Sequence, residues 1–287
     1  MAPDDLAARR ERLRRWQDGL LLILTWGVGL AGVSFPIAIV SFLLYRGTGA
    51  ISWDLLWQAP KTFPIGSSGG IRPAIEGSVA LIALGLTVSL PLGVGGAIYL
   101  AEFSQSEPFK RAMLFLSSCS SGVPAIVYGL CGFALFVVAL NMKVSLAAGA
   151  LTLGMVMLPI VLIGAYEAIV AVEGKYRDAA LSLGVSRLHA FRKIVWPKSR
   201  PGILGAIVLA AGHAFGSAAP VLLTASIVLS KGGLELSSPV MTLPTHLYYL
   251  VSEASSLEQA YATALILVMI LLLANLAVML CKSTREG

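Results

Sequence analysis

Six stretches of the chain contain no Asp, Glu, Lys or Arg and exceed the roughly 18 to 20 residues that cross a bilayer core about 30 Å thick. These stretches are residues 20–45, 77–101, 112–142, 144–166, 201–230 and 259–281. We therefore predict an all-α polytopic membrane protein with six transmembrane helices. Residues 236–252 are apolar but shorter and contain two prolines and a histidine, so we expect an external or partly re-entrant segment there.

The overall composition supports a membrane protein. The 287 residues are 57% hydrophobic and 13% charged, whereas soluble globular proteins carry roughly 25% charged residues. An ordinary cytosolic enzyme is therefore not expected. The first apolar run follows a basic segment, but it is much longer than the roughly 7 to 15 apolar residues of a signal peptide. We interpret it as a membrane anchor.

The basic residues predict the orientation in the membrane. With both termini in the cytoplasm, 16 of the 21 Lys and Arg residues lie on the cytoplasmic side, as the positive-inside rule requires. This orientation divides the chain into a basic N-terminal arm (1–19), a first transmembrane helix (20–45), an external loop (46–76), a five-helix core (77–281) and a cytoplasmic tail (282–287). The core includes a cytoplasmic loop (171–200) and an external segment (231–258). Topology and anionic lipid explain the net charge of +6, so no nucleic-acid partner is expected.

Motifs for catalysis are missing from the sequence. It contains no GxxxxGK[ST] phosphate loop, no HExxH and no GxSxG. We therefore predict no catalytic residue, no cofactor and no metal site on this chain, and any energy source has to be external. Cys119, Cys131 and Cys281 all lie in apolar runs, and we interpret them as buried apolar side chains rather than as disulfide partners or metal ligands.

The cytoplasmic loop 171–200 has an unusual internal order for a connection between spans. Residues 173–183 are expected to form a short helix that ends at Gly184, because glycine readily adopts the left-handed conformation. Ser186 is expected to cap a second helix, and Pro197 to end it. A basic amphipathic segment lying on lipid is the alternative interpretation.

The spacing of residues in this loop resembles the EAA motif of ABC importer permeases, EAA-x3-G-x9-I-x-L-P. Asp stands here in place of the usual Glu, and Trp196 in place of Leu. In that family the motif docks into a groove of a separate ATPase subunit, so the resemblance implies a coupling role for the matching residues. These are Asp178, Ala179, Ala180, Gly184, Ile194 and Pro197.

The resemblance extends from about Gly69 over most of the chain and is greatest to the PstA-type permeases of phosphate importers. The similar segments include LPLGVGGAIYLAE (90–102), SGVPAIVYG (121–129), GSAAPVLLT (216–224) and TLPTHLY (242–248). The resemblance implies the type I ABC importer permease fold in a bacterial plasma membrane. It also implies ATP-binding subunits, a second related permease forming a heterodimer, and an external phosphate-binding protein as partners.

The sequence departs from the family pattern where charge would matter. The family usually has an Arg and a Glu four residues apart in the fifth span, and this chain has His213 and Ser217 there. On a continuous helix His213, Ser217 and Pro220 share one face near mid-membrane, and we expect them to line a translocation path that offers hydrogen-bond donors to an oxyanion. The alternative is that these groups only bond a neighbouring helix or the carbonyl four residues earlier.

Prolines and glycines within the spans predict local geometry. Pro91, Pro124 and Pro159 free backbone carbonyls and are expected to permit kinks. Close helix packing is the expected role of a second group of small residues, Gly85, Gly93, Gly95 and Gly96.

Three functions remain open from the sequence. The first is a permease subunit of an ATP-driven phosphate importer, and the second is a permease of the same superfamily for a different oxyanion or small solute. The third is an intramembrane serine hydrolase that uses Ser217 with His213, although no orienting third group or oxyanion-hole motif is visible.

Overall fold

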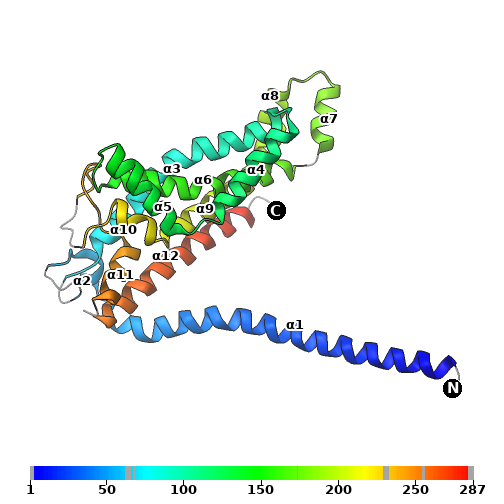
Figure 1. Ribbon diagram of the computed structural model, residues 1–287, viewed down its shortest axis with the longest axis horizontal. Helices are drawn as coiled ribbons and strands as arrows, with labels where there is room; N and C mark the ends of the chain where they lie inside the picture. Colours follow the sequence, from blue (N-terminus) through cyan, green and yellow to red (C-terminus); the bar gives the residue numbers. More distant parts are fainter. Residues whose placement is uncertain are drawn as a thin grey trace.

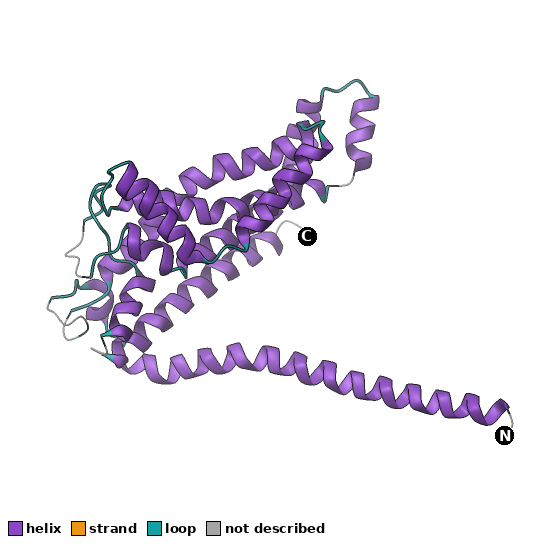
Figure 2. Cartoon of the chain, in the orientation of Figure 1, coloured by secondary structure: helices purple, strands orange, loops and turns teal. Residues whose placement is uncertain are grey.

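The computed structural model describes residues 3–61, 66, 69–172, 174–228, 233–253 and 256–283, and side chains within these ranges except those of residues 3–15, 177, 178, 181, 278 and 280–283. The described part is helical (Figure 2). Its longer helices are α1 (Pro3–Gly47), α3 (Arg72–Ile98), α4 (Glu107–Ser121), α6 (Leu146–Val170), α9 (Trp196–Phe215) and α12 (Leu257–Ser283). Shorter helices are α2 (Trp53–Trp57), α5 (Ala125–Gly132), α7 (Gly174–Ser182), α8 (Arg187–Ala190), α10 (Ala219–Thr224) and α11 (Leu243–Ser252). The 3-10 turn η1 (Thr48–Ala50) follows α1, and three π-helical turns extend α3, α5 and α8, namely η2 (Tyr99–Phe103), η3 (Phe133–Ala139) and η4 (Phe191–Val195).

Four helical segments in the described residues are long and apolar enough to cross a membrane. They are Trp16–Ala50, Arg72–Phe103, Leu146–Val170 and Leu257–Ala277, and they coincide with the first, second, fourth and sixth predicted runs. A fifth candidate is the pair Glu107–Ser121 and Ala125–Ala139, which covers the third run and is bent by 99°. Length and composition therefore support a membrane-spanning helix at four of the six predicted runs, and at a fifth if the bent pair forms one span.

The bend in the third run lies at Pro124. Gly122 ends α4, and Pro124 has extended backbone angles (φ −55°, ψ 136°) as the residue before α5. Proline also disfavours a helical conformation at the residue before it, here Val123. The expected kink at Pro124 is confirmed. The predicted burial of Cys119 and Cys131 is wrong, because both are exposed, and the side chain of Cys281 lies outside the described residues.

The fifth run, 201–230, is also divided, although we expected one continuous helix. Helix α9 ends at Phe215, residues 216–218 are not helical, and α10 starts at Ala219. Pro220 explains part of this break, because proline has no N–H to bond the carbonyl four residues earlier and its ring clashes with that carbonyl. His213, Ser217 and Pro220 therefore do not share one helix face. We call residues 216–218 the α9–α10 break.

Helix α6 is the centre of the bundle, with α3 and α9 packed against it (Figure 1). Small residues allow this close packing. A Cβ atom at Gly85 would lie 2.6 Å from Met157 Cε, and one at Gly93 would lie 2.8 Å from Val161 Cγ1. The predicted packing role is thus confirmed for these glycines, and also for Gly96, which faces Leu162 at 3.3 Å. It is wrong for Gly95, where a Cβ would meet no atom within 4 Å.

Helix α1 leaves the bundle and contacts it only near its C-terminal end (Figure 1). There the rings of Phe42 and Tyr261 are 5.6 Å apart in an edge-to-face arrangement, which joins α1 to α12. None of the apolar 18-residue window in this helix is buried within the chain. The helix begins at Pro3, so the basic arm predicted for residues 1–19 continues into the first span without a break.

The segment before and within α11 packs against the start of α3. Ser78 Oγ accepts a hydrogen bond of 2.8 Å from the backbone N–H of Leu243, and a Cβ at Gly77 would overlap Met241 O. Thr242 and Thr245 form a capping box at the start of α11. The structure therefore places a folded helix within the segment that we expected to be external or re-entrant. This helix lies at the opposite end of the bundle from α7 and α8 (Figure 1).

Candidate functional site

The first half of the loop 171–200, which the sequence predicts to be cytoplasmic, folds as predicted. Helix α7 ends in a left-handed residue, Gly184, at φ +75°. The backbone N–H of Val185 bonds Ala180 O at 3.1 Å, which is the six-to-one bond of a Schellman motif. Position 173 lies outside the described residues. The glycine termination of this helix is confirmed, and we call residues 171–200 the coupling loop.

The second half of the loop differs from prediction at its end. Ser186 Oγ accepts from the backbone N–H of His189 at 3.4 Å and caps α8 as expected. The predicted end at Pro197 is wrong, because α8, η4 and α9 form one unbroken helical run from Arg187 to Phe215. A π-helical turn directly precedes α9 and changes the hydrogen-bond register, so Pro197 falls in the first turn of α9, where a missing N–H is tolerated.

The structure places the six residues of the EAA-like motif on both halves of the loop, and α7 packs against α8 and η4. Ala180 is buried and Ile194 is half-buried, so these two contribute to the packing of the loop. Ala179, Gly184 and Pro197 are exposed. The side chain of Asp178 lies outside the described residues.

A contact that the sequence did not suggest fixes α7 to the start of α9. Lys198 Nζ lies 3.4 Å from the centroid of the Tyr176 ring, a cation–π geometry. Below it, Val172, Phe191 and Val195 pack in a buried cluster that also contains Ile169 of α6 and Ile203 of α9. The coupling loop is therefore tied by an apolar cluster and a charged contact to two helices of the core.

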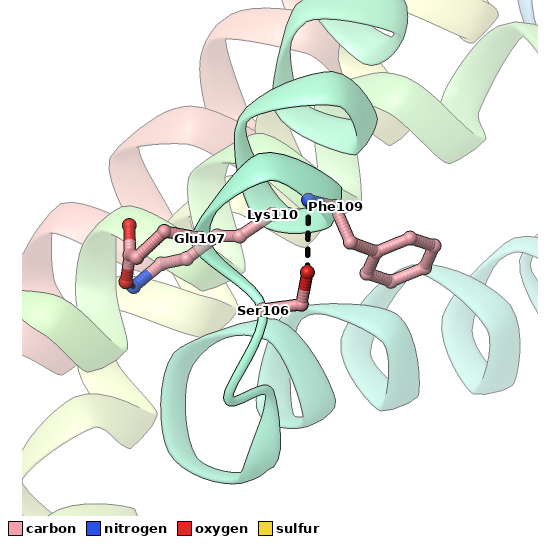
Figure 3. A network of polar contacts seen from close by, with 4 residues as sticks. All are labelled: Ser106, Glu107, Phe109 and Lys110. Atoms are coloured by element: carbon pink, nitrogen blue, oxygen red, sulfur yellow. Dashed lines mark hydrogen bonds and ion pairs between the residues drawn. The ribbon is translucent and has the colours of Figure 1, made fainter.

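The neighbouring loop between α3 and α4 lies at the same end of the bundle (Figure 1). Ser106 caps α4 by accepting from the backbone N–H of Phe109 at 3.4 Å, and Lys110 Nζ lies 3.5 Å from Glu107 Oε1 (Figure 3). The same ammonium lies 5.8 Å from the centroid of the Tyr166 ring on α6. This contact connects the first turn of α4 to the last turns of the central helix.

The α9–α10 break contains the second group of predicted site residues. Ser217 Oγ donates a 2.8 Å hydrogen bond to the backbone carbonyl of His213. The side chain of His213 is exposed in the last turn of α9, and Pro220 is buried in the first turn of α10. In this conformation Ser217 therefore makes the local backbone bond that was the alternative to a role in a path.

A small cavity lies beside this break. Its volume is about 10 Å³, room for about one water molecule. Three of its lining residues carry hydroxyl groups and come from different parts of the chain: Ser217 of the break, Ser78 of α3 and Thr242 before α11. We call it the hydroxyl cavity. His213 does not line it.

Sequence reasoning missed two residues of this cavity. Thr242 belongs to the TLPTHLY segment that resembles the PstA-type permeases, so that resemblance could have identified it. Ser78 lies in an apolar run without any distinguishing neighbour, and only the fold brings it to Leu243, 165 positions later in the chain.

A buried histidine in α11 is the second feature that the sequence analysis left without a role. His246 is 1% exposed, and neither ring nitrogen has a hydrogen-bond partner among the described residues. Helix α11 has ten residues and is not among the candidate spans. Burial lowers the pKa of His246 from 6.5 to about 4, so its imidazole is neutral at physiological pH.

The geometry around Ser217 does not support the hydrolase hypothesis. A serine nucleophile needs a base within hydrogen-bond reach of its Oγ, whereas Ser217 Oγ donates to a backbone carbonyl. The described residues contain no group of three or more His, Cys, Asp or Glu side chains that could hold a metal ion.

Comparison with known proteins identifies the family to which the chain belongs. Residues 93–282 match the family described as the binding-protein-dependent transport system inner membrane component, which includes the coupling loop and the α9–α10 break. The chain belongs to this family. It is therefore a multi-pass inner-membrane component of a transport system, as the sequence predicted.

Two relatives of this inner-membrane component carry the name that the resemblance suggested. The phosphate transport system permease protein PstA 2 of Mycobacterium bovis is 34% identical over 235 residues, covering 79% of this chain and 75% of the relative. The phosphate transport system permease protein PstA of Pasteurella multocida is 27% identical over 265 residues, covering 92% of this chain and 93% of the relative.

Solved structures confirm the predicted permease fold. A bacterial alginate ABC transporter, in complex with an alginate pentasaccharide-bound periplasmic protein, aligns with a TM-score of 0.63 at 16% identity, covering 94% of each chain. The MetNI methionine ABC transporter in an inward-facing conformation aligns with a TM-score of 0.59 at 15% identity, covering 75% of this chain and 94% of that chain.

Proposed function

We propose that this inner-membrane component is a permease subunit of an ATP-driven importer for inorganic phosphate. The observation that carries the proposal is the coupling loop, in which the EAA-like spacing coincides with a glycine-terminated helix packed onto the core. The names of the PstA relatives support phosphate as the substrate. ATP hydrolysis then takes place on separate subunits, and this chain is not itself an enzyme.

The partners follow from the same proposal. The coupling loop binds an ATP-binding subunit, a second related permease completes the path, and an external phosphate-binding protein delivers the substrate. A fold neighbour that is in complex with a substrate-bound periplasmic protein supports this arrangement. The lipid bilayer surrounds the assembly.

The orientation proposed from the basic residues also fits the arrangement of the helices. The coupling loop and the visible C-terminal end of α12 lie at one end of the bundle, and α1 runs toward that side from the opposite end (Figure 1). Both termini and the coupling loop are therefore assigned to the cytoplasm of a bacterial cell. Helix α11 and the hydroxyl cavity lie toward the outside.

Helix continuity suggests how the movement is transmitted. The run from Arg187 to Phe215 is unbroken, about 40 Å long at about 1.5 Å per residue. A displacement of the coupling loop by the ATPase would therefore move α9 as a rod, and the first flexible point along it is the α9–α10 break. We assign the break to the opening and closing of the path.

In this proposal the hydroxyl cavity is the closed form of part of the path. Ser217 would donate its hydroxyl to the anion once the break opens and releases the bond to His213 O, with Ser78 and Thr242 beside it, and His213 and Pro220 would flank it. Hydroxyl donors can bind an oxyanion without a fixed charge. Because His213 and Ser217 replace the Arg and Glu usual in PstA-type permeases, a different oxyanion or small solute is the second candidate substrate.

Reconstitution of the whole assembly tests the proposal. The chain would be co-purified with its partner subunits, placed in lipid vesicles with the external binding protein, and assayed for ATP hydrolysis with phosphate, sulfate or molybdate. We expect stimulation by phosphate alone and no hydrolysis by this chain without its partners. Stimulation by another anion would favour the second candidate, and an assembly without an ATPase subunit would contradict both.

A further inference from the structure

An apolar groove runs along the bundle surface between α3 and α9, in the half nearer the coupling loop. Its volume is about 640 Å³. Leu90, Pro91, Val94 and Gly95 form the α3 side, and the α9 side runs from Trp196 and Arg200 to Ile207. Both helices pack on α6 behind it. We call this surface the inner groove.

One glycine of α3, Gly95, lies in the groove without contact to another helix. A Cβ atom at Gly95 would meet nothing within 4 Å, unlike those at Gly85 and Gly93, which face α6. Gly95 therefore is not needed for close packing of α3 against another described helix of this chain. It leaves space on the outer side of α3 that any larger side chain would fill.

Charge is confined to one end of this groove. Among the described residues that line it, Arg200 alone is charged, and its guanidinium carbon lies 5.5 Å from the centroid of the Trp196 ring. Within the described part of the chain, no carboxylate lies within 4.0 Å of Arg200. Lys198, two positions earlier, is engaged with the Tyr176 ring at 3.4 Å. Arg200 is thus available for an external anion.

These features fit a phospholipid better than a protein helix. Acyl chains are as apolar as Leu and Ile, so an apolar groove holds one without selecting its headgroup. Tryptophan is enriched at the level of the headgroups, and the planar arginine fork suits two oxygens of a phosphate. A partner helix in the groove would instead have to place a carboxylate beside Arg200, whereas a phospholipid carries its own phosphate at this level.

We infer that the inner groove binds an anionic phospholipid of the cytoplasmic leaflet, with an acyl chain beside Gly95 and the phosphate on Arg200. The depth assignment rests on the orientation given under the proposed function. The transported solute does not enter the argument. A lipid in this place would lie against the last residues of the coupling loop, Trp196 and Arg200, and against the part of α9 that follows them.

Lipid retention provides the test. The full transporter would be extracted in mild detergent, exchanged into phosphatidylglycerol or phosphatidylcholine, and examined by native mass spectrometry for lipid bound per copy of this chain. We expect one phosphatidylglycerol to be retained at least tenfold more strongly than phosphatidylcholine. Arg200→Gln should abolish this preference, and Arg200→Lys, which keeps the charge, should restore part of it.

Matched variants separate a bound lipid from a general effect of charge or bulk. Gly95→Leu fills the groove and should remove the lipid, whereas Gly205→Leu adds the same side chain to α9 where a Cβ also meets nothing within 4 Å. Arg192→Gln removes an exposed arginine of η4 that does not line the groove. Both controls should retain the lipid.

Two results would overturn the inference. One is equal retention of the two lipids by the unaltered chain, or retention that does not respond to Arg200→Gln and Gly95→Leu. The other is complete cross-linking to the second permease of a Gly95→Cys variant in which the exposed Cys119 and Cys131 are replaced by Ser, because this would show that a protein helix covers the groove. Neither readout requires transport, so a wrong substrate assignment would leave the lipid result intact.

Discussion

The ammonium group of Lys198 lies 3.4 Å from the centre of the Tyr176 ring, which joins the coupling helix α7 to the first turn of α9. The two residues are 22 positions apart and lie on opposite sides of Gly184. The side chain of Tyr176 is 38% exposed, so the contact lies at the surface. The contact therefore spans the loop, and both of its partners move if the ATPase moves α7.

Removing the Tyr176 ring should loosen this coupling. An exposed cation–π contact is worth about 0.5–1 kcal/mol, so Tyr176→Leu should lower phosphate uptake per ATP hydrolysed about two- to fivefold. Tyr176→Phe keeps the ring and should remain close to the unaltered chain. Uptake and ATP hydrolysis would be measured in the same vesicles. Equal ratios for the Leu and Phe variants would assign the contact no role in coupling.

Gly184 is expected to be the most sensitive position of the coupling loop. At φ +75° a residue with a Cβ is strained by roughly 1–2 kcal/mol, and a β-branched one more. Gly184→Val should disrupt the Schellman motif and abolish uptake while the membrane bundle still folds. Gly184→Asn, which tolerates this conformation, should retain much of the activity. Gly174→Ala in the same helix meets no atom within 4 Å and serves as the neutral control.

The apolar runs predicted the membrane helices because burial in lipid depends only on composition over about 20 residues. The glycine stop at Gly184 and the serine cap at Ser186 were also predictable, since each rests on the conformation of one or two residues. The predicted helix end at Pro197 was wrong because a π-helical turn directly before α9 places this proline in the first turn of that helix, where the lack of an N–H is tolerated. A change of hydrogen-bond register of that kind leaves no pattern in the sequence.

The hydroxyl cavity is a second feature that the sequence did not predict. Ser78, Ser217 and Thr242 meet only because α3, the α9–α10 break and the segment before α11 converge. On a continuous helix His213 and Ser217 would share one face, but α9 ends at Phe215, before Ser217 is reached. The convergence of these three segments therefore could not be read from residue spacing alone.

The hydroxyl group of Ser217 should matter for uptake rather than for folding. Its loss removes one hydrogen bond, worth about 0.5–1.5 kcal/mol, so Ser217→Ala should reduce uptake about two- to tenfold with normal assembly. Ser118→Ala removes an equivalent bond, from Ser118 Oγ to Leu114 O at 2.9 Å on α4, and should leave uptake unchanged. Equal effects of the two variants would indicate a general helix effect.

His213 can be separated from Ser217 by its own variant. His213→Ala leaves the backbone carbonyl that Ser217 bonds, so it tests the imidazole alone. We expect reduced uptake with unchanged co-purification of the partner subunits. Full uptake by His213→Ala would show that the imidazole does not line the translocation path. The residues of the hydroxyl cavity would then be the remaining candidates for its polar lining.

Two glycines of α3 should respond in opposite ways to the same substitution. Gly77→Ala places a methyl group against Met241 O, and overpacking of this kind costs about 1–3 kcal/mol. Gly95→Ala meets open space and should be neutral or stabilising by up to about 1 kcal/mol from helix propensity. Thermal unfolding of the purified variants measures both. Similar melting temperatures for the two would contradict the packing of α11 on α3.

The stability of the chain should fall in acid in a way that depends on His246. Its folded pKa of about 4 lies below the ordinary value of 6.5, so the unfolded chain binds the proton more readily. The folded state therefore loses stability as pH falls from about 6.5 toward 4, by a total of about 3 kcal/mol. Above pH 6.5 this residue makes no pH-dependent contribution.

A difference measurement isolates this residue from the carboxylates that also titrate in acid. Melting temperatures of the unaltered chain and of His246→Gln would be compared at pH 7, 6, 5 and 4, with His189→Gln as the exposed control. As pH falls, we expect the melting temperature of the unaltered chain to decrease more than that of His246→Gln, because the amide cannot take up a proton. The control should follow the unaltered chain. A gap that stays constant with pH would mean that the imidazole finds water or a partner on protonation.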